Sequence, residues 1–135
     1  MYKILFFVIC LVAQVCYGVH DSQAIAVAYY TAMAEKNMSK VADFLNPDVV
    51  FSAPLATMVG KENFLHRVEE FFACFLTLTI KKSVGCHDKA VLLFEVQYPA
   101  PINNVEFVAI LHIKDGLIDQ VELLYDESVF TSSEI

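Results

Sequence analysis

The sequence predicts a single α+β domain, because helix-like and strand-like segments are segregated along the chain. Apolar residues recur at helical spacing up to about residue 75, and apolar and polar residues alternate in several segments between residues 76 and 125. Gly and Pro number only four each, and no linker or repeat divides the chain. A length of 135 residues suits one domain, and segregated helices and strands are typical of the α+β class.

The first 18 residues have the layout of a secretory signal peptide. Lys3 is followed by the uncharged apolar run Ile4–Val15, and a small residue, Gly18, precedes the expected cleavage site. A run of about a dozen residues is shorter than the ~20 that a membrane-spanning helix needs. We therefore expect residues 1–18 to be removed. The mature domain, residues 19–135, would have no stable membrane span and would be secreted or periplasmic.

Three helices are predicted before residue 76. The first covers Ala24–Glu35, with Asp21 or Ser22 as its N-cap. The second is short and begins at Ser39 as its cap, and the third follows Gly60. The third helix is the clearest, because its apolar side chains fall in one narrow stripe at about 100° per residue. The stripe consists of Phe64, Val68, Phe71, Phe72 and Phe75.

One short strand and four long ones are predicted. The short strand is Val49–Phe51, after a turn at Asn46–Asp48. A two-residue hairpin turn at Asp115–Gly116 joins the last two long strands. The long strands are Leu76–Val84, Ala90–Tyr98, Val105–Lys114 and Leu117–Tyr125. In the third of these every odd-numbered residue is apolar, so one side of the sheet packs on the helices.

Two cysteines, Cys74 and Cys86, lie outside the predicted signal peptide. A predicted strand joins them, and ten extended residues span about 33 Å, whereas a disulfide holds its two Cα atoms within about 7 Å. We therefore predict two unpaired, buried thiols. Neither the cysteines nor the histidines have the spacing of a zinc site, so no metal or other cofactor is expected.

The chain is acidic, with sixteen Asp and Glu against nine Lys and Arg and a formal charge of −7. Nucleic-acid binding depends on clustered basic residues, so a nucleic-acid partner is excluded, as is a basic helix on a membrane surface. A hydrophobic fraction of 57% is too high for a disordered chain. The sequence thus describes a small, acidic and apolar globular domain.

Four local patterns occur in a familiar order between residues 22 and 127. They are Tyr30–Met33 on the first helix, Leu45–Phe51 into the first strand, Ala53–Pro54 with Gly60–Lys61 ahead of the long helix, and Ile113–Ile118 at the last hairpin. In this the chain resembles the nuclear transport factor 2-like superfamily, in its SnoaL-like and ketosteroid-isomerase-like branches. The resemblance implies a curved antiparallel sheet wrapped around the long helix as a cone, with an apolar cavity inside. Isomerases, cyclases, dehydratases and binding domains share this fold, which therefore does not choose a function.

The resemblance also implies where catalytic groups would stand. In the isomerase branch a general-base aspartate precedes the proline of the first strand, and this chain has Ala53 before Pro54. A second carboxylic acid of that branch would fall near Ile110, where the chain is apolar. Tyr30 could correspond to the oxyanion-hole tyrosine, or it could be a core tyrosine. An alanine cannot accept a proton, so steroid-isomerase chemistry is disfavoured.

Cyclases of the SnoaL type imply an acidic group in the cavity, because a carboxyl in an apolar pocket has a raised pKa and can transfer protons. The candidates are Asp119, Glu122 and Asp126, of which Asp126 matches the family's ending. Its alternative role is that of a cap at the strand end or a surface charge. His66 and His112 fall on polar faces of their predicted elements, and neither is expected to act as a base.

Three readings of function stay open. The domain binds a small apolar ligand without the isomerase base, or it is a cavity enzyme of the cyclase, isomerase or dehydratase type that uses Asp126 with Tyr30, or it is a non-catalytic interaction domain. The residues expected to line the cavity are Tyr29, Tyr30, Met33, Phe51, Phe64, Val68, Phe94, Phe107 and Leu111. A homodimer is expected through the outer sheet face at Val91, Leu93, Val108 and Ile110.

Overall fold

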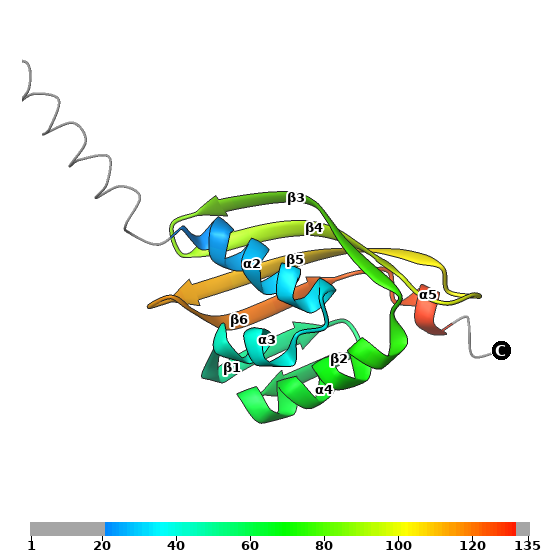
Figure 1. The fold of residues 1–135 in the computed structure, drawn as a ribbon, viewed down its shortest axis with the longest axis horizontal. Coiled ribbons are helices and arrows are strands. Elements are labelled where there is room, and N and C mark those ends of the chain that lie inside the picture. The colour runs from blue at the N-terminus through cyan, green and yellow to red at the C-terminus, as the bar shows by residue number, and fades with distance from the viewer. Residues whose placement is uncertain (1–20, 132–135) are drawn as a thin grey trace, which may run out of the picture.

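The computed structural model describes residues 21–131 and confirms the α+β class (Figure 1). The predicted signal peptide, residues 1–18, lies outside the described residues. Helices begin and end the described chain, and one long helix lies between the second and third strands. In order, the elements are α2 (Ser22–Ala34), α3 (Met38–Asp43), β1 (Leu45–Ala53), β2 (Ala56–Val59), α4 (Lys61–Cys74), β3 (Thr77–Cys86), β4 (Lys89–Gln97), β5 (Asn104–Lys114), β6 (Leu117–Leu124) and α5 (Ser128–Thr131).

The strands form one six-stranded, curved and unclosed sheet in the order β2-β1-β6-β5-β4-β3. Neighbouring strands are antiparallel except β1 and β6, which run parallel. Sequence reasoning missed β2, whose four residues are too short for an alternation to be recognised, and the four-residue α5. The predicted turn of the last hairpin is confirmed, since Asp115 and Gly116 both have positive φ, 53° and 80°.

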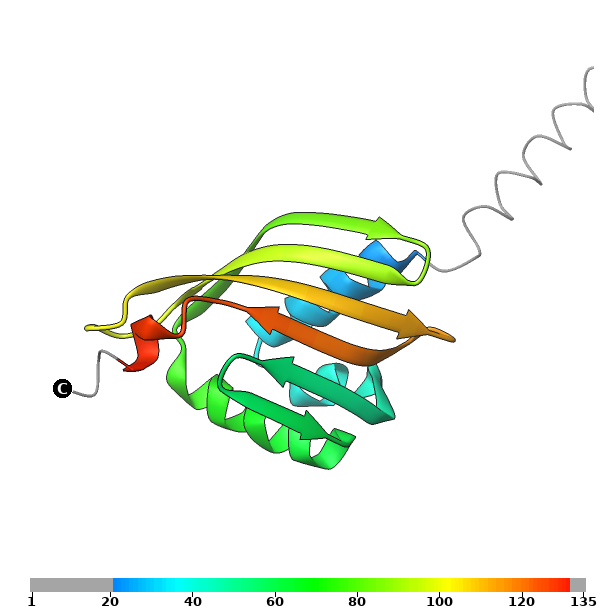
Figure 2. The same ribbon diagram turned by 180° about the vertical axis from the view of Figure 1, so that it is seen from behind.

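The helices cover the concave face of the sheet, and Figure 2 shows its other face uncovered. Helix α2 packs on β3 and β4, whereas α4 packs on β1 and β2. On β5 the odd-numbered residues from Val105 to Ile113 are all buried and face these helices, as the alternation predicts. On α4 the inward side begins with Phe64 and Val68, both almost fully buried. The core therefore lies between two helices and one bent sheet.

Side chains cap the first two helices. The Asp21 carboxylate accepts a hydrogen bond from the Ala24 backbone N–H at 3.1 Å, which confirms one of the two expected caps. The cap of α3 is Asn37 and not Ser39, because the helix already begins at Met38 and the Asn37 side chain accepts from the Lys40 backbone N–H. Both residue types suit an N-cap, so the sequence allowed either start.

The predicted turn at Asn46–Asp48 is a distortion inside β1 and does not precede the strand. The Asn46 side-chain oxygen accepts a hydrogen bond from the Asp48 backbone N–H at 2.9 Å, and the pairing with β6 shifts register between Leu45 and Val50. An Asx turn of this kind offers the backbone a local partner in place of the ladder. Strand β1 is consequently longer than the sequence predicts.

The two cysteines are unpaired, as predicted, but both are exposed. Cys74 is the last residue of α4 and lies off the apolar stripe of that helix. Cys86 ends β3, an edge strand with few buried residues. Within residues 21–131, no helix combines the length and the apolar character needed to cross a membrane.

Candidate functional site

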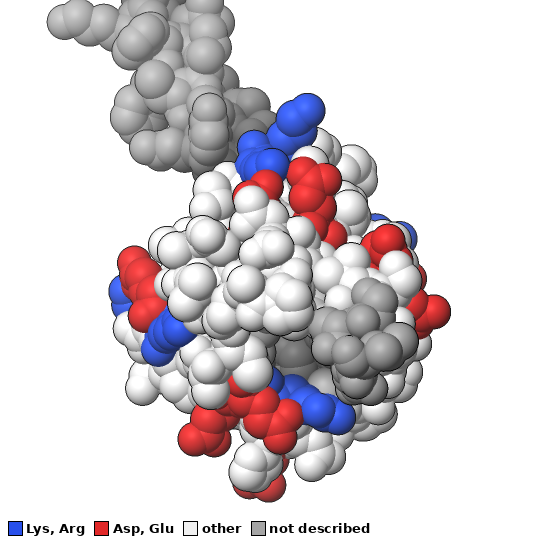
Figure 3. Space-filling model, turned by 90° about the vertical axis from the view of Figure 1, so that its right-hand side faces the viewer, with Lys and Arg blue, Asp and Glu red and all other residues white. Residues whose placement is uncertain are grey.

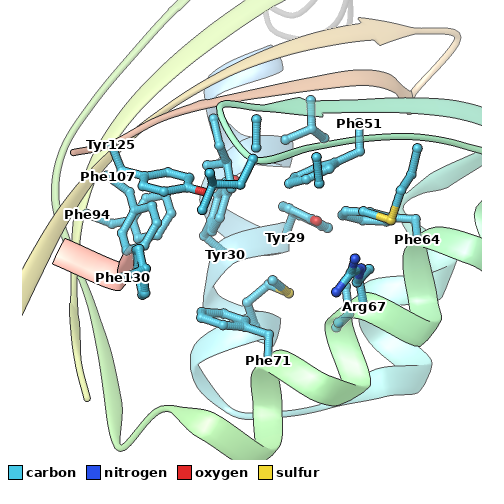
Figure 4. A pocket seen from close by; sticks show the side chains of 18 of the residues that line it. Tyr29, Tyr30, Phe51, Phe64, Arg67, Phe71, Phe94, Phe107, Tyr125 and Phe130 are labelled. Carbon is cyan, nitrogen blue, oxygen red and sulfur yellow. The ribbon is translucent and has the colours of Figure 1, made fainter. Parts of the chain in front are cut away.

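A cavity of about 390 Å³ lies between the concave face of the sheet and the helices α2 and α4. Most of its lining is apolar and aromatic, and it draws on α2, β1, β2, α4, β4, β5, β6 and α5. Its size falls in the range of roughly 300 to 1,000 Å³ that is usual for small-molecule sites. Figure 4 shows rings from both helices and from the sheet directed into this space.

Most residues expected to line the cavity do so. They are Tyr29, Tyr30, Met33, Phe51, Phe64, Val68, Phe94 and Phe107. Leu111 does not line it, although it lies in the same inward row of β5 as Phe107. Leu111 pairs with Ala90 on β4 and Val121 on β6 and is completely buried, because the interior is filled at that end of the strand.

Aromatic rings in edge, tilted and stacked contact form a continuous chain along the cavity. Tyr30 contacts Phe94 with ring centroids 4.5 Å apart, and Phe94 stacks on Phe107 at 5.3 Å with the planes only 6° apart. Phe107 contacts Tyr125 at 5.1 Å, and Tyr125 meets Phe130 of α5 edge-on at 5.4 Å. Since rings in such contacts support one another beyond their buried area, this wall is preformed.

Two tyrosine hydroxyls of α2 are available to a ligand. Tyr29 and Tyr30 are buried, with only 1% and 2% of their surface exposed, and Figure 4 shows Tyr29 directed into the cavity. Neither hydroxyl has a hydrogen-bond partner among the described residues. Burial raises the pKa of both phenols, and the neighbouring Tyr30 raises that of Tyr29 further. Both therefore stay protonated, so they can donate a hydrogen bond but cannot act as bases near neutral pH.

Ala53, the position that the resemblance assigns to the isomerase base, is part of the cavity wall. Its methyl group offers neither a proton acceptor nor a donor. No Asp, Glu or His stands among the lining residues in the described part of the chain. General acid–base catalysis needs such a group within hydrogen-bond reach of the substrate, and the titratable side chains that residues 21–131 bring to the lining are phenols and one arginine.

Asp126 lies outside the cavity lining and is exposed. Its carboxylate accepts hydrogen bonds from the Ser128 backbone N–H at 3.0 Å and from the Ser128 hydroxyl at 2.6 Å. These two bonds lower the pKa of Asp126, which keeps it ionised rather than ready to donate a proton. Its observed contacts are those of a cap that follows the last strand and starts α5.

The other two acidic candidates are also absent from the lining. Glu122 pairs with Ile110 on the outer side of the sheet. At Asp119 the pairing of β5 with β6 shifts register, so that Ile118 and Val121 both point inward. One Asp119 oxygen is buried without a partner, yet it does not reach the cavity. Strict alternation fails here because a bulge adds one residue.

Sequence reasoning missed Arg67, which is the only charged residue that lines the cavity within residues 21–131. It follows Phe64 by three positions and precedes Phe71 by four, so it shares their helix face. A cation inside an apolar stripe was the available signal. Figure 4 shows its guanidinium projecting from α4 into the cavity. The lining residues Tyr98, Tyr125 and Phe130 were missed too, because each follows the end of a strand or lies on the short α5.

The cavity opens toward the end of the molecule where α5 lies. Figure 3 looks onto this end and shows a hollow with a basic side chain beside it. A second, more open groove shares Arg67, Phe71, Tyr98 and Phe130 with the cavity and continues over the β4–β5 loop. Arg67 has 59% of its side chain exposed, so it stands at the mouth where cavity and groove meet.

No group of three or more His, Cys, Asp and Glu side chains in residues 21–131 is arranged to hold a metal ion. His66 and His87 are exposed, and His112 lies half-buried on β5 outside the cavity. His87 has a positive φ of 54° in the β3–β4 turn, and its carbonyl accepts a hydrogen bond from the Ser22 hydroxyl. The described histidines therefore have structural or surface positions.

Solved structures with the same fold span several names. A protein of Kribbella flavida DSM 17836 superposes with a TM-score of 0.78 at 20% identity, over 83% of this chain and 92% of that one. A proposed ketosteroid isomerase from the same organism superposes with a TM-score of 0.70 at 19% identity, over 78% of this chain and 77% of that one. A proposed polyketide cyclase from Sinorhizobium meliloti superposes with a TM-score of 0.68 at 23% identity, over 74% of this chain and 93% of that one. At these identities the likeness establishes the fold and leaves the function open.

No curated protein matches the chain in sequence. The family model of the SnoaL-like domain matches residues 26–121, which extend from the middle of α2 into β6 and include most of the cavity wall. Family match, curved sheet and cavity agree with one another, and the chain belongs to the SnoaL-like domain family.

Proposed function

We propose that the domain binds a small apolar ligand in the cavity and does not catalyse proton transfer there. The observation that carries the proposal is a cavity of about 390 Å³ walled by aromatic rings and lacking any lining Asp, Glu or His among the described residues. Apolar burial supplies roughly 25 cal/mol for each Å² removed from water. The Tyr29 and Tyr30 hydroxyls supply orientation through hydrogen bonds to a ligand acceptor.

The competing proposal is a cavity enzyme of the cyclase, isomerase or dehydratase type with Asp126 and Tyr30 as its polar pair. Two of the similar structures carry isomerase and cyclase names. Against it, the Asp126 carboxylate is exposed and already bonded to Ser128, and the Tyr30 hydroxyl is a phenol with a raised pKa. A donor without a base can polarise a carbonyl but cannot abstract a proton from the substrate.

Blocking the cavity tests the proposal. Neutral lipophilic probes (decanol, naphthalene and a steroid) are titrated while the melting temperature is followed. At a concentration 100-fold above its Kd, a probe stabilises the fold by about 2.7 kcal/mol. Ala53→Phe places a ring in the cavity and should abolish this gain. The matched control Ala73→Phe adds the same ring on the exposed side of α4 and should keep it.

Two outcomes would contradict the binding function. Either no probe stabilises the wild-type protein, or Ala53→Phe responds to the probes as strongly as the wild type. Turnover of a probe that disappears in Tyr30→Phe would instead favour the enzyme.

We also propose that the outer sheet face pairs with a second copy of the chain. Val91 is 41% exposed, and register places it opposite Ile110, with Leu93 opposite Val108. Leu124 on β6 is 46% exposed and lies opposite Val108 of β5, so it extends this apolar area. A two-fold contact would bury the same patch from both copies. Light scattering at micromolar concentration should give a dimer, and Val108→Glu should give a monomer. A monomeric wild type would rule out the pairing.

The function is proposed for an exported protein. The apolar run and the small residue at Gly18 support removal of residues 1–18. In a secreting host the mature protein should therefore begin at Val19 outside the cytoplasm, which intact mass measurement would check. A full-length mass in the cytoplasmic fraction would refute export.

A further inference from the structure

The cavity carries one positive charge at its mouth, in a protein that is otherwise strongly acidic. Arg67 is the single charged side chain of the lining within residues 21–131, and the whole chain has a formal charge of −7. The general field of the molecule repels anions. Any preference for an anionic ligand must therefore come from this arginine.

The partner that Arg67 now has is weak and leaves most of its donors unused. One guanidinium nitrogen, Nη1, donates to Glu70 Oε2 at 3.1 Å, one turn further along α4. Both side chains are more than half exposed, 59% and 66%, and exposed pairs of this kind contribute little. Nε and Nη2 have no partner among the described residues. A guanidinium with two free donors matches the two oxygens of a carboxylate.

The surroundings of Arg67 fit a molecule with one apolar and one charged end. On one side lies the aromatic cavity, and on the other the open groove that also contains Glu70 and Cys74. A ligand that buries its apolar body against Phe64 and Phe71 therefore brings its end group out beside the guanidinium.

We propose that the ligand is an amphipathic acid, whose apolar body fills the cavity and whose carboxylate binds Arg67 at the mouth. This inference rests on the proposed binding function and narrows its ligand class. Glu70 competes with the ligand carboxylate for the same guanidinium, so it weakens the binding of anions. The neutral analogue of such an acid keeps the apolar contacts and loses the contact with Arg67.

Decanoate and decanol form a matched pair of probes for titration calorimetry at neutral pH. The wild type should bind decanoate about tenfold more tightly than decanol, a difference of about 1.4 kcal/mol. Arg67→Gln should abolish the preference by weakening decanoate alone. Glu70→Gln should strengthen decanoate binding several-fold, because it frees Nη1. Lys61→Gln removes the same charge from the start of α4, outside the cavity lining, and should leave the preference unchanged. Added salt should reduce it.

The possible failures are distinguishable. Equal binding of decanoate and decanol by the wild type, or equal weakening of both by Arg67→Gln, would overturn the anionic ligand and leave the cavity as a binding site for neutral molecules. Absence of binding for both probes, with no difference between the wild type and Ala53→Phe, would overturn the binding function itself.

Discussion

The two ends of the interior are built from the same strands and differ in how they are filled. Toward the β3–β4 hairpin, β4 and β5 contribute Leu92 and Leu111, both completely buried. Phe94 lies two residues beyond Leu92 on β4, and Phe107 lies four residues before Leu111 on β5. Both point inward, and at their level the interior is hollow. Branched aliphatic side chains interdigitate to high density. Flat rings that support one another by edge and face contacts form a stable wall, and the space enclosed by that wall stays unfilled.

Burial of a side chain and filling of the space beside it are separate properties. Phe94 and Phe107 are almost as buried as the leucines, at 2% and 5% exposure, yet they line a space large enough for a ligand. An apolar inward row is therefore sufficient for a core and not sufficient to predict where that core is solid. Four experiments test this difference between the filled and the hollow end.

Removing equal volume from each end should give the largest difference. Leu111→Ala leaves a cavity in the filled end and should lower the free energy of unfolding by about 3 to 4 kcal/mol. Leu123→Ala, on the half-buried wall of the hollow end, should cost about 1 kcal/mol because its surroundings are already open. Denaturant unfolding measures both. Equal losses would show that the two ends are packed alike.

Adding atoms should also destabilise the filled end more than the hollow end, with a smaller difference in the free energy of unfolding. A Cβ at Gly85 would lie 2.6 Å from Gln23 Cβ and 2.7 Å from Gln23 N, where α2 rests on β3. Gly85→Ala should therefore cost about 2 kcal/mol, as overpacking usually does. Ala53→Phe adds a whole ring at the hollow end and should change stability by less than about 1 kcal/mol. A larger loss for Ala53→Phe than for Gly85→Ala would contradict the comparison.

Alkaline titration should weaken the hollow end, because its tyrosines titrate. Burial raises the pKa of Tyr29 and Tyr30 above the roughly 10 of a free phenol. The unfolded chain loses these protons from about pH 10 while the folded chain keeps them. Stability is thus fully present below pH 10 and falls above it, by about 1.4 kcal/mol per pH unit for each tyrosine. Tyr30→Phe should make the decline shallower, and a profile that is flat to pH 12 would refute the burial effect.

Asp126 should give the smallest effect, confined to the short helix α5 beside the mouth of the cavity. Asp126→Ala removes the acceptor of two Ser128 hydrogen bonds and should speed amide exchange in α5. Asp126→Asn keeps an acceptor and loses the charge, so its exchange rate in α5 should lie between those of the wild type and Asp126→Ala. Because the pKa of Asp126 is lowered, the contribution of its ionised form is present above about pH 4 and declines as the pH falls further. If Asp126→Asn changed the affinity for decanol, the charge of Asp126 would instead contribute to ligand binding in the cavity.

Much of the fold could be predicted because its signals are local. The odd-numbered row of β5 specifies which face is buried, and Asp115–Gly116 specifies the last turn. The stripe that begins at Phe64 and Val68 specifies the inward side of α4. The register shifts at Asn46–Val49 and at Asp119 have no such signal, because they depend on how β1 meets β6.

The site was less predictable for a physical reason. Alternation assigns Leu111 and Phe107 to the same face, and only their positions along the bent sheet decide which of them meets empty space. Arg67 required reading a charge within an apolar stripe as functional rather than as an interruption. Asp126 could be recognised as a strand-end carboxylate, but its direction depends on Ser128, two residues on.

The distribution of tyrosines gives this molecule an internal optical signal. Between residues 21 and 131 there are four tyrosines, Tyr29, Tyr30, Tyr98 and Tyr125, and all of them line the cavity. The chain contains no Trp to obscure them. Tyrosine absorbance and emission from residues 21–131 therefore originate at the cavity wall, and a guest molecule can be followed by intrinsic tyrosine fluorescence without any attached dye.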